Sequence, residues 1–306
     1  MSAFSEIEHI VIGGGPDLVC HWPRQGGLWC WGDEILAAYI EAPCKYTDPE
    51  QVGHGQGGIW QRGYVRLRRS TDAGATWTDS GVVFDNAQPV EAQRRALRLD
   101  DYEGHRGPDR ESIDLSSPDT VLLMGRAWCG DEHDLPDGST AHGNVTYGFR
   151  SPDRGRRWES VPSILWPHHT STVVELANNV MPLGGARAVC WLVGSGGIEG
   201  VSEARLYAPQ LYASENHGAT WDFYSEIACD PTGRIASSYP QVLALPSGRW
   251  LCTLGCWYVT AGARIRWTSI CHSDDEGLNW SEPRRIHVWS VSPYPVLLDD
   301  GRIVLV

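Results

Sequence analysis

An eight-residue pattern returns four times along this 306-residue chain and constrains its fold more than any other feature. The pattern is Ser-x-Asp/Asn-x-Gly-x-x-Trp, and its copies occupy residues 70–77, 151–158, 214–221 and 273–280. The four tryptophans are 81, 63 and 59 residues apart, so the period is loose. One such match can arise by chance, but four indicate a repeated structural unit.

Each octet predicts a tight turn. Aspartate or asparagine accepts hydrogen bonds from nearby backbone N–H groups, and glycine supplies the positive φ that such a turn needs. The tryptophan begins the next strand, and we expect its ring to lie buried between layers. A strand-like run precedes every octet, as in "GYVRLRRS" and "IRWTSICHS". Each octet is therefore predicted to close a β-hairpin.

A second element recurs upstream of each octet: an apolar run, a turn and another apolar run. Examples are "DLVCHWPRQGGLWCWGDEILAAY", "ESIDLSSPDTVLLMGRAW" and "YPQVLALPSGRWLCTLGCW". One unit therefore reads strand, turn, strand, long loop, strand, octet turn, strand. Four antiparallel strands in a period of about 50 to 80 residues are typical of a β-propeller blade.

The octets resemble the Asp boxes, or BNR repeats, of the sialidase (neuraminidase) superfamily, and the likeness extends from about Val11 to the end of the chain. Asn216 replaces the aspartate of the third octet, and Arg157 and Asn279 replace the threonine of the second and fourth. The resemblance implies an all-β, six-bladed sialidase-type propeller with four-stranded antiparallel blades. About four and a half blades are recognisable, so we expect a single propeller domain over residues 1–306 that is incomplete at its C-terminus. The run "EHIVIGGG" is a candidate closing strand for the last blade.

Blade topology predicts which end of the molecule carries function. The octets and the turns "PRQGG", "LPSGR" and "LDDGR" join strands 3 to 4 and 1 to 2, so they share one end. The other end receives the long, irregular connections, where function usually resides. These connections are residues 41–62, 88–110, 128–144, 166–170, 194–205, 229–239 and 257–264.

The resemblance also implies a catalytic set. Sialidases bind the substrate carboxylate with three arginines, use a Tyr–Glu pair as nucleophile and use a loop aspartate as acid/base. Here Gly14 stands where the first arginine is expected, and Tyr239 stands where a glutamate is expected. The first loop offers Asp48 or His54 as the acid/base residue, although a solvated carboxylate is the alternative for Asp48. Tyr239 is a candidate nucleophile or proton donor, with packing at the blade crossing as its alternative role.

Further residues are candidates for substrate binding around the central axis. Asp109 and Arg110 lead into the second inner strand, and a structural ion pair is the alternative for them. Arg126 is a candidate anion anchor. The remaining candidates of the long connections are Glu41, Trp128, His168 and His169. Tyr294 is a further candidate, because Tyr239 and Tyr294 are expected to open the fourth and fifth inner strands in matching Tyr-Pro contexts. No motif of metal-ligand spacing such as HExxH accompanies the histidines, so we expect neither a metal nor a cofactor.

Composition restricts the partners. The formal charge is −13 and the pI about 5.2, which disfavours nucleic acid. No apolar stretch approaches the roughly 20 residues that span a bilayer, so no membrane is expected. The N-terminal residues lack a secretion-signal pattern, which leaves the localisation open and makes it cytoplasmic if the N-terminus is native. The nine cysteines form no CxxC pair and are expected to be mostly buried free thiols.

Three functions fit these observations. The leading hypothesis is a sialidase-like glycoside hydrolase acting on a terminal sugar of an oligosaccharide or glycoconjugate. The alternatives are a polysaccharide lyase acting on uronate-containing glycans and a non-catalytic glycan-binding propeller. All three require a carbohydrate partner.

Overall fold

The computed structural model describes most of the chain. The described residues are 9–21, 26–52, 62–101, 104–105, 110–128, 130, 133–134, 140–141, 143–166, 168, 172–198, 201–259, 265–290 and 292–306.

Apart from the short pair β7 and β8, the described strands form five antiparallel sheets, which are numbered in chain order. Sheet 1 contains β1 (Leu18–His21), β2 (Gly27–Trp31), β3 (Glu34–Pro43), β4 (Tyr64–Ser70) and β5 (Thr78–Asp85). Its strand order is β1-β3-β4-β5, and β2 pairs with β3 on the same edge as β1. Sheet 2 contains β6 (Val121–Trp128), β9 (Asn144–Ser151) and β10 (Ser163–Leu165). Sheet 3 contains β11 (Thr172–Gly184), β12 (Arg187–Ile198), β13 (Val201–Ser214) and β14 (Asp222–Glu226). Sheet 4 contains β15 (Ile235–Ala244), β16 (Trp250–Tyr258), β17 (Arg266–Ser273) and β18 (Arg284–Ile286). Sheet 5 contains β19 (Pro295–Leu297) and β20 (Ile303–Leu305).

The remaining elements are short. β7 (His133–Asp134) and β8 (Thr140–Ala141) pair with each other. The helices α1 (Pro49–Val52) and α3 (Val90–Ala96) lie in connections that leave sheet 1 from β3 and β5. None of the helices in the described part of the chain has the length and apolar character needed to cross a membrane.

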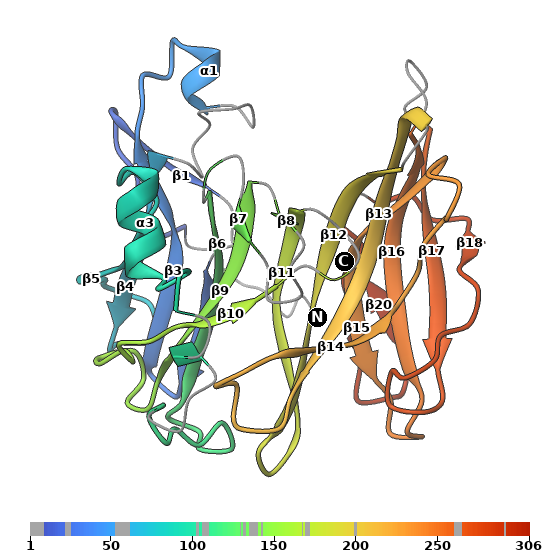
Figure 1. Cartoon of the computed structure of the whole chain (residues 1–306). Coiled ribbons are helices and arrows are strands. Elements are labelled where there is room, and N and C mark those ends of the chain that lie inside the picture. Colours follow the sequence, from blue (N-terminus) through green and yellow to red (C-terminus); the bar gives the residue numbers. More distant parts are fainter. Residues whose placement is uncertain are drawn as a thin grey trace.

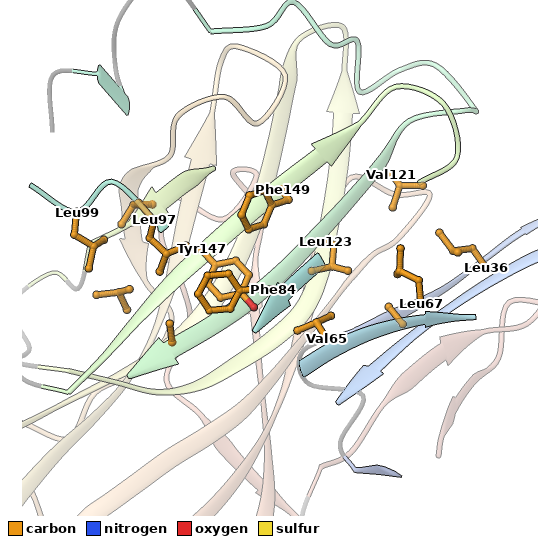
Figure 2. Close-up of a cluster of buried hydrophobic side chains, with 14 residues drawn as sticks. Leu36, Val65, Leu67, Phe84, Leu97, Leu99, Val121, Leu123, Tyr147 and Phe149 are labelled. Carbon is orange, nitrogen blue, oxygen red and sulfur yellow. The ribbon is translucent and has the colours of Figure 1, made fainter. Parts of the chain in front are cut away.

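Successive sheets pack face to face, with sheet 1 at the left of Figure 1 and sheet 4 at the right. Alternate residues of β3 and β4, such as Leu36 and Leu67, point into the first core, where they meet Val121, Leu123 and Tyr147 of sheet 2 (Figure 2). Two further cores join sheet 2 to sheet 3 and sheet 3 to sheet 4. Both faces of the middle sheets are therefore buried, which explains why β9 is buried along its whole length.

The four octets adopt the same turn. In the first, the Ser70 hydroxyl donates to Asp72 Oδ1 at 2.7 Å and accepts the Gly74 N–H at 2.8 Å. Asp72 Oδ1 also accepts the Thr76 N–H at 2.8 Å. The other octets repeat the serine and aspartate or asparagine contacts. The predicted turn chemistry is thus present in every copy.

The turn needs two residues with positive φ, not one. Gly74 has φ 92° as expected, but Ala73 before it also has φ 56°. The residues at this second position are Ala73, Arg154, His217 and Glu276, with φ between 56° and 61°. A side chain in this region is strained, and the hydrogen bonds of the turn hold it there.

Each octet from the second onward is also bonded to the sheet before it. Arg69 of sheet 1 donates to the Arg154 carbonyl at 2.7 Å, and Arg150 of sheet 2 donates to the His217 carbonyl at 3.1 Å. Ser225 of sheet 3 donates to the Gly277 carbonyl at 2.5 Å. The octets therefore join neighbouring sheets as well as neighbouring strands.

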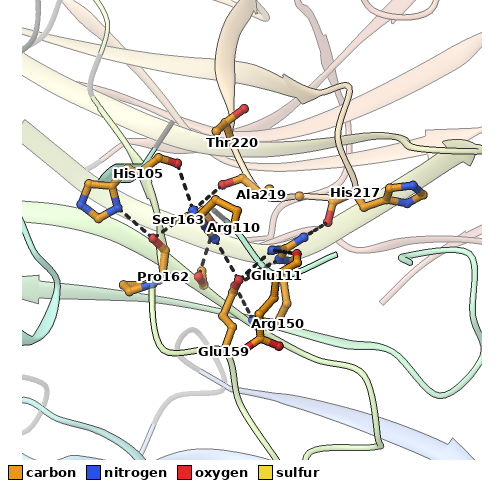
Figure 3. Close-up of polar contacts among 12 residues, drawn as sticks. His105, Arg110, Glu111, Arg150, Glu159, Pro162, Ser163, His217, Ala219 and Thr220 are labelled. Carbon is orange, nitrogen blue, oxygen red and sulfur yellow. Dashed lines mark hydrogen bonds and ion pairs between the residues drawn. The ribbon is translucent and has the colours of Figure 1, made fainter. Parts of the chain in front are cut away.

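The strongest of these joints is a buried ion cluster (Figure 3). Arg150 is 1% exposed, and its NH2 donates to Glu159 Oε2 at 2.7 Å, while the Arg150 N–H donates to Oε1 at 2.9 Å. Arg110 donates to the same Oε2 at 2.9 Å and to the Ala219 carbonyl in the third octet at 2.8 Å. Two cations thus share one buried carboxylate and connect sheet 2 to the third octet.

The strand register confirms that the octets and the first turns lie at the same end of the molecule. The serine that begins each octet pairs with the first or second residue of the strand after the first turn: Ser70 with Ile35, Ser151 with Val121, Ser214 with Ala188, Ser273 with Trp250. Octets and first turns therefore share one end, called the octet end. The opposite end, called the loop end, receives the connections between strands 2 and 3 and between sheets.

Two predicted connections are wrong. The turn of the first unit is Gly32–Asp33, not "PRQGG", because β1 and β2 on either side of that segment both pair with β3. Residues 194–205 are not a long loop: β12 and β13 extend through most of them as one long hairpin, and residues 199–200 lie outside the described part. Glycines within strands produced both errors, since glycine is also the commonest turn residue.

Two predicted strands do not form. The run "ESIDL" has no ladder partner, so sheet 2 shows three strands rather than four. Residues 9–14 of "EHIVIGGG" form no strand either, and the residues before them lie outside the described part.

Replacing Glu159 with Gln should lower the free energy of unfolding by about 3–5 kcal/mol, because Arg150 and Arg110 stay buried without a countercharge. Urea unfolding measures this change. Glu215→Gln is the matched control, since its pair with Arg187 is exposed and the expected change is below about 1 kcal/mol. Similar values for the two variants would contradict the structural role of the cluster.

The pKa of Asp72 is lowered to about 2 by hydrogen bonds from Thr76 and Ser70. This stabilisation is complete above the unfolded pKa of about 3.9 and is lost as the pH falls towards 2. Asp72→Asn keeps an acceptor, as Asn216 does in the third octet, but removes the charge. The difference in Tm between wild type and Asp72→Asn should therefore shrink between pH 4 and pH 2, and a constant difference would contradict this origin.

Candidate functional site

Glu41 lies at the loop end of β3 and is 3% exposed. It stands between Cys20 of β1 and Tyr64 of β4 in the strand register. Arg66 Nε donates to Glu41 Oε1 at 3.1 Å, and Arg68 NH2 lies 3.9 Å from Oε2. This predicted substrate-binding carboxylate is therefore part of a charged cluster on sheet 1.

Asp48 directly precedes α1. The Gln51 N–H donates to the Asp48 carbonyl at 3.0 Å, and Gln51 Nε2 donates to Asp48 Oδ2 at 2.8 Å. Gln51 Oε1 in turn accepts the Lys45 N–H at 2.8 Å. Asp48 thus helps to hold the single helical turn of the first loop, while His54 lies outside the described residues.

The glycines at the position of the expected sialidase arginine have a packing role. A Cβ on Gly13 would collide with the Tyr39 hydroxyl, and a Cβ on Gly14 would lie 3.6 Å from Cys20 Sγ. Gly14 also has φ 91°, which disfavours arginine there. The backbone of this segment rests directly on Tyr39, whose hydroxyl donates to the Ile12 carbonyl at 3.4 Å.

Tyr239 occupies a β-bulge midway along β15. The register passes from Ser238–Gly255 to Gln241–Thr253, so Tyr239 and Pro240 together face one residue of β16. Tyr239 has φ 53°, in the left-handed region that a bulky residue rarely adopts. Tyr239 therefore lies inside the innermost strand rather than opening it as predicted, and the bulge redirects its side chain.

Arg126 and Trp128 lie on the same face of β6, since they are two residues apart in a strand. This face carries Met124 and is the one turned towards sheet 3. Trp128 pairs with Asn144 at the loop end. The structure thus places both predicted residues near the loop end of sheet 2.

Arg110 is not brought to the loop end. Besides Glu159 and Ala219, it donates to the His105 carbonyl at 3.1 Å (Figure 3). These partners lie beside the third octet, which corresponds to the structural alternative for this residue. Asp109 lies outside the described residues.

His168 lies away from the innermost strands. Its ring stacks on Phe223 of β14, the outermost strand of sheet 3, with centroids 3.8 Å apart. Its carbonyl accepts a hydrogen bond from Gln210 at 2.5 Å. His169 lies outside the described residues, and Tyr294, 48% exposed, pairs through its backbone with Val306 beside sheet 5.

Several polar and aromatic residues were not identified from the sequence. At the loop end between sheets 3 and 4, Tyr207 meets Trp257 edge-on at 5.4 Å, and the Arg266 guanidinium lies 5.7 Å from the Trp257 ring centroid. On sheet 1, Tyr39 and Arg68 accompany Glu41. The alternation of "YVRLRRS" was the available signal, because it places Arg66 and Arg68 on one face opposite Val65 and Leu67.

Within the part of the chain that the structure describes, no three histidine, cysteine or acidic side chains converge to hold a metal ion. Of the eight described cysteines, five are buried as free thiols: Cys44, Cys190, Cys252, Cys256 and Cys271. Cys20 and Cys30 are exposed.

No protein-family model matches the sequence, and no curated protein matches it either. Solved structures do match. A protein of unknown function from Dyadobacter fermentans aligns with a TM-score of 0.61 and 17% identity over 97% of this chain and 77% of its own. A sialidase from Streptococcus pneumoniae aligns with a TM-score of 0.55 and 12% identity over 92% of this chain and 56% of its own. These similarities define the fold as that of the sialidase-type propellers.

A third similar structure is the α-L-arabinanase of Penicillium chrysogenum in complex with arabinobiose. It aligns with a TM-score of 0.53 and 17% identity over 89% of this chain and 71% of its own. The chain is thus an all-β protein with four-stranded antiparallel sheets in a fold shared with glycoside hydrolases, and the resemblance drawn from the octets is confirmed at the level of the fold.

Cys20 is exposed as a whole residue, but its thiol is partly buried, and this partial burial together with the neighbouring Glu41 carboxylate raises the pKa of the thiol. Replacing Glu41 with Gln should lower this pKa, so Cys20 should react faster with iodoacetamide at pH 8. Peptide-resolved mass spectrometry measures the rate, with Cys30 as the internal control. An unchanged or slower Cys20 rate would contradict the charge coupling.

Proposed function

We propose that the chain is a sialidase-like glycoside hydrolase that acts at its loop end on a terminal sugar of an oligosaccharide or glycoconjugate. Two proteins of similar fold, a sialidase and an arabinanase, are glycoside hydrolases by name, and the arabinanase binds arabinobiose. We also propose that the five sheets belong to a single six-bladed propeller domain, in which sheet 5 is the first half of a fifth blade.

The bulge at Tyr239 is the observation that carries this proposal. Backbone strain and β-bulges concentrate at functional sites, where they redirect one side chain. Tyr239 combines both features midway along the first strand of sheet 4. A tyrosine in this place suits the role of nucleophile or proton donor.

The other predicted residues take supporting roles in this proposal. Asp48 or His54 serves as the acid/base residue, with Asp48 released from Gln51 when substrate binds. Arg126, Trp128 and Glu41 hold the sugar from sheets 1 and 2, with Tyr294, His168 and His169 at the margin. Asp109 is a further contact to the sugar in this proposal, whereas Arg110 has only a structural role.

A non-catalytic glycan-binding propeller is the second candidate. It is favoured by Gly14 at the place of the sialidase arginine and by the contacts that hold Asp48 at α1. A polysaccharide lyase is distinguished from both by its unsaturated uronate product.

Replacing Tyr239 with Phe should lower kcat on the cleaved substrate by about 10²- to 10⁴-fold, because the phenol oxygen is lost while the ring and backbone remain. Release of reducing sugar from arabinobiose, sialosides and aryl glycosides measures the effect. Tyr224→Phe, in the outer strand β14, is the matched control and should retain activity and Tm.

Three outcomes would overturn the proposal. If wild type releases no sugar from any of these substrates but binds them, the chain is a glycan-binding protein. If uronate glycans yield an unsaturated product, it is a lyase. If Tyr239→Phe retains full activity, Tyr239 has a packing role only.

A further inference from the structure

The first loop is held by a single arginine near its end. The loop leaves β3 at Pro43 and re-enters sheet 1 at Tyr64, and Arg62 lies just before this return. Arg62 NH2 donates to the Gln51 carbonyl at 2.6 Å, and Arg62 NH1 donates to the Pro43 carbonyl at 3.3 Å. One guanidinium therefore connects the start of the loop, its helical turn α1 and its end.

An arginine suits this connection, because its planar group presents several N–H donors in a fixed geometry. The Gln51 carbonyl belongs to α1, which has four residues and no basic residue in its last turn. The last carbonyls of a helix have no partner within the helix, and a single helical turn is not stable alone. Arg62 supplies from outside the donor that this turn lacks.

Gln51 connects the guanidinium to Asp48. The Gln51 side chain donates from Nε2 to Asp48 Oδ2 at 2.8 Å, and its backbone N–H donates to the Asp48 carbonyl at 3.0 Å. Gln51 Oε1 accepts the Lys45 N–H at 2.8 Å, and the Asp48 N–H donates to the Lys45 carbonyl at 2.9 Å. Arg62 is thus linked through one residue to the carboxylate of a candidate acid/base residue.

The helical turn α1 projects beyond the strands of sheet 1, as Figure 1 shows at the upper left. The start of the loop is anchored to the sheet, because the Cys44 N–H donates to the Asp17 carbonyl at 2.9 Å. The contact from Arg62 to Pro43 ties α1 to this anchored start. Arg62 therefore helps to fix the position of Asp48 relative to sheet 1.

We propose that Arg62 is a positioning residue for Asp48, and this inference rests on the proposed hydrolase with Asp48 as its acid/base residue. An acid/base residue acts only within hydrogen-bond reach of the oxygen that it protonates. A displacement of about 1 Å costs about 10²-fold in rate. Arg62 acts at a distance from the carboxylate by holding α1, and Gln51 transfers this constraint to Asp48.

The same contacts predict a local effect when the arginine is lost. Both acceptors of Arg62 belong to the loop or to the last residue of β3. Removal of the guanidinium should therefore open the loop and leave the sheets folded.

The test compares Arg62→Ala and Asp48→Asn with the wild type, on whichever of arabinobiose, sialosides and aryl glycosides the wild type cleaves. Arg249→Ala is the matched control, because its guanidinium pairs with Asp274 at the exposed octet end of sheet 4. Hydrogen exchange of the Asp48 and Gln51 amides reports on the loop, and kcat and KM are measured separately. Guanidine is then added at millimolar concentration to each variant to replace the lost group.

We expect the exchange of both amides to rise about tenfold in Arg62→Ala, with kcat about 10²-fold lower and KM changed less than about threefold, because the substrate contacts remain. Guanidine should restore part of kcat in Arg62→Ala and none in Asp48→Asn. The Tm of Arg62→Ala should stay within about 3 °C of the wild type, since the sheets stay folded. Arg249→Ala should leave exchange, kcat and KM unchanged.

Four outcomes would overturn the inference. Unchanged exchange or unchanged kcat in Arg62→Ala would show that Arg62 does not position Asp48. A loss of kcat that guanidine does not restore, together with a large fall in Tm, would make Arg62 a residue of the fold alone. Full activity of Asp48→Asn would overturn this inference and leave the hydrolase proposal intact with another acid/base residue. A wild type that releases no sugar would overturn the hydrolase proposal together with this inference.

Discussion

A hydrogen bond from one sheet to the backbone of the next octet is the interaction on which the arrangement of the sheets depends. Three carbonyls, of Arg154, His217 and Gly277, each accept such a bond from the preceding sheet. The octet glycine allows this close approach between sheets, because a Cβ on Gly155 would lie only 2.6 Å from the Leu36 side chain of sheet 1. One octet therefore forms a turn, holds its backbone at positive φ and contacts the preceding sheet.

Because the octets hold one end of the sheets together, the connections at the opposite end can differ in length and shape. The octet end consists of short turns held by the serine and aspartate or asparagine hydrogen bonds, whereas the loop end carries a long hairpin in sheet 3 and a helical turn after β3. The strain at Tyr239 is tolerated because the strand on both sides of the bulge is paired with β16. A rigid end and an adaptable end are what a fold needs if it serves several glycoside hydrolases.

The sequence predicted most of the fold, and the predictions that were wrong have physical causes. Four similar octets and the alternating runs around them specify hairpins, so the four-stranded repeat and the two ends follow from local chemistry. Connections were wrongly predicted at "PRQGG" and at residues 194–205, because glycine occurs within strands as well as in turns. The short run "ESIDL" has a strand-like composition, but composition does not supply a ladder partner.

The site was less predictable, because it depends on where side chains point. Arg110 follows a loop and was expected at the axis, yet Glu159 and the third octet hold it elsewhere. Tyr39 and Arg68, which lie beside Glu41, were overlooked, since only the register of β3 with β4 brings these side chains together. The most direct test of the account is a crystal structure of Tyr239→Phe with an oligosaccharide. We expect sugar at the loop end within reach of residue 239, and sugar bound among the octets with none at the loop end would contradict the proposed site.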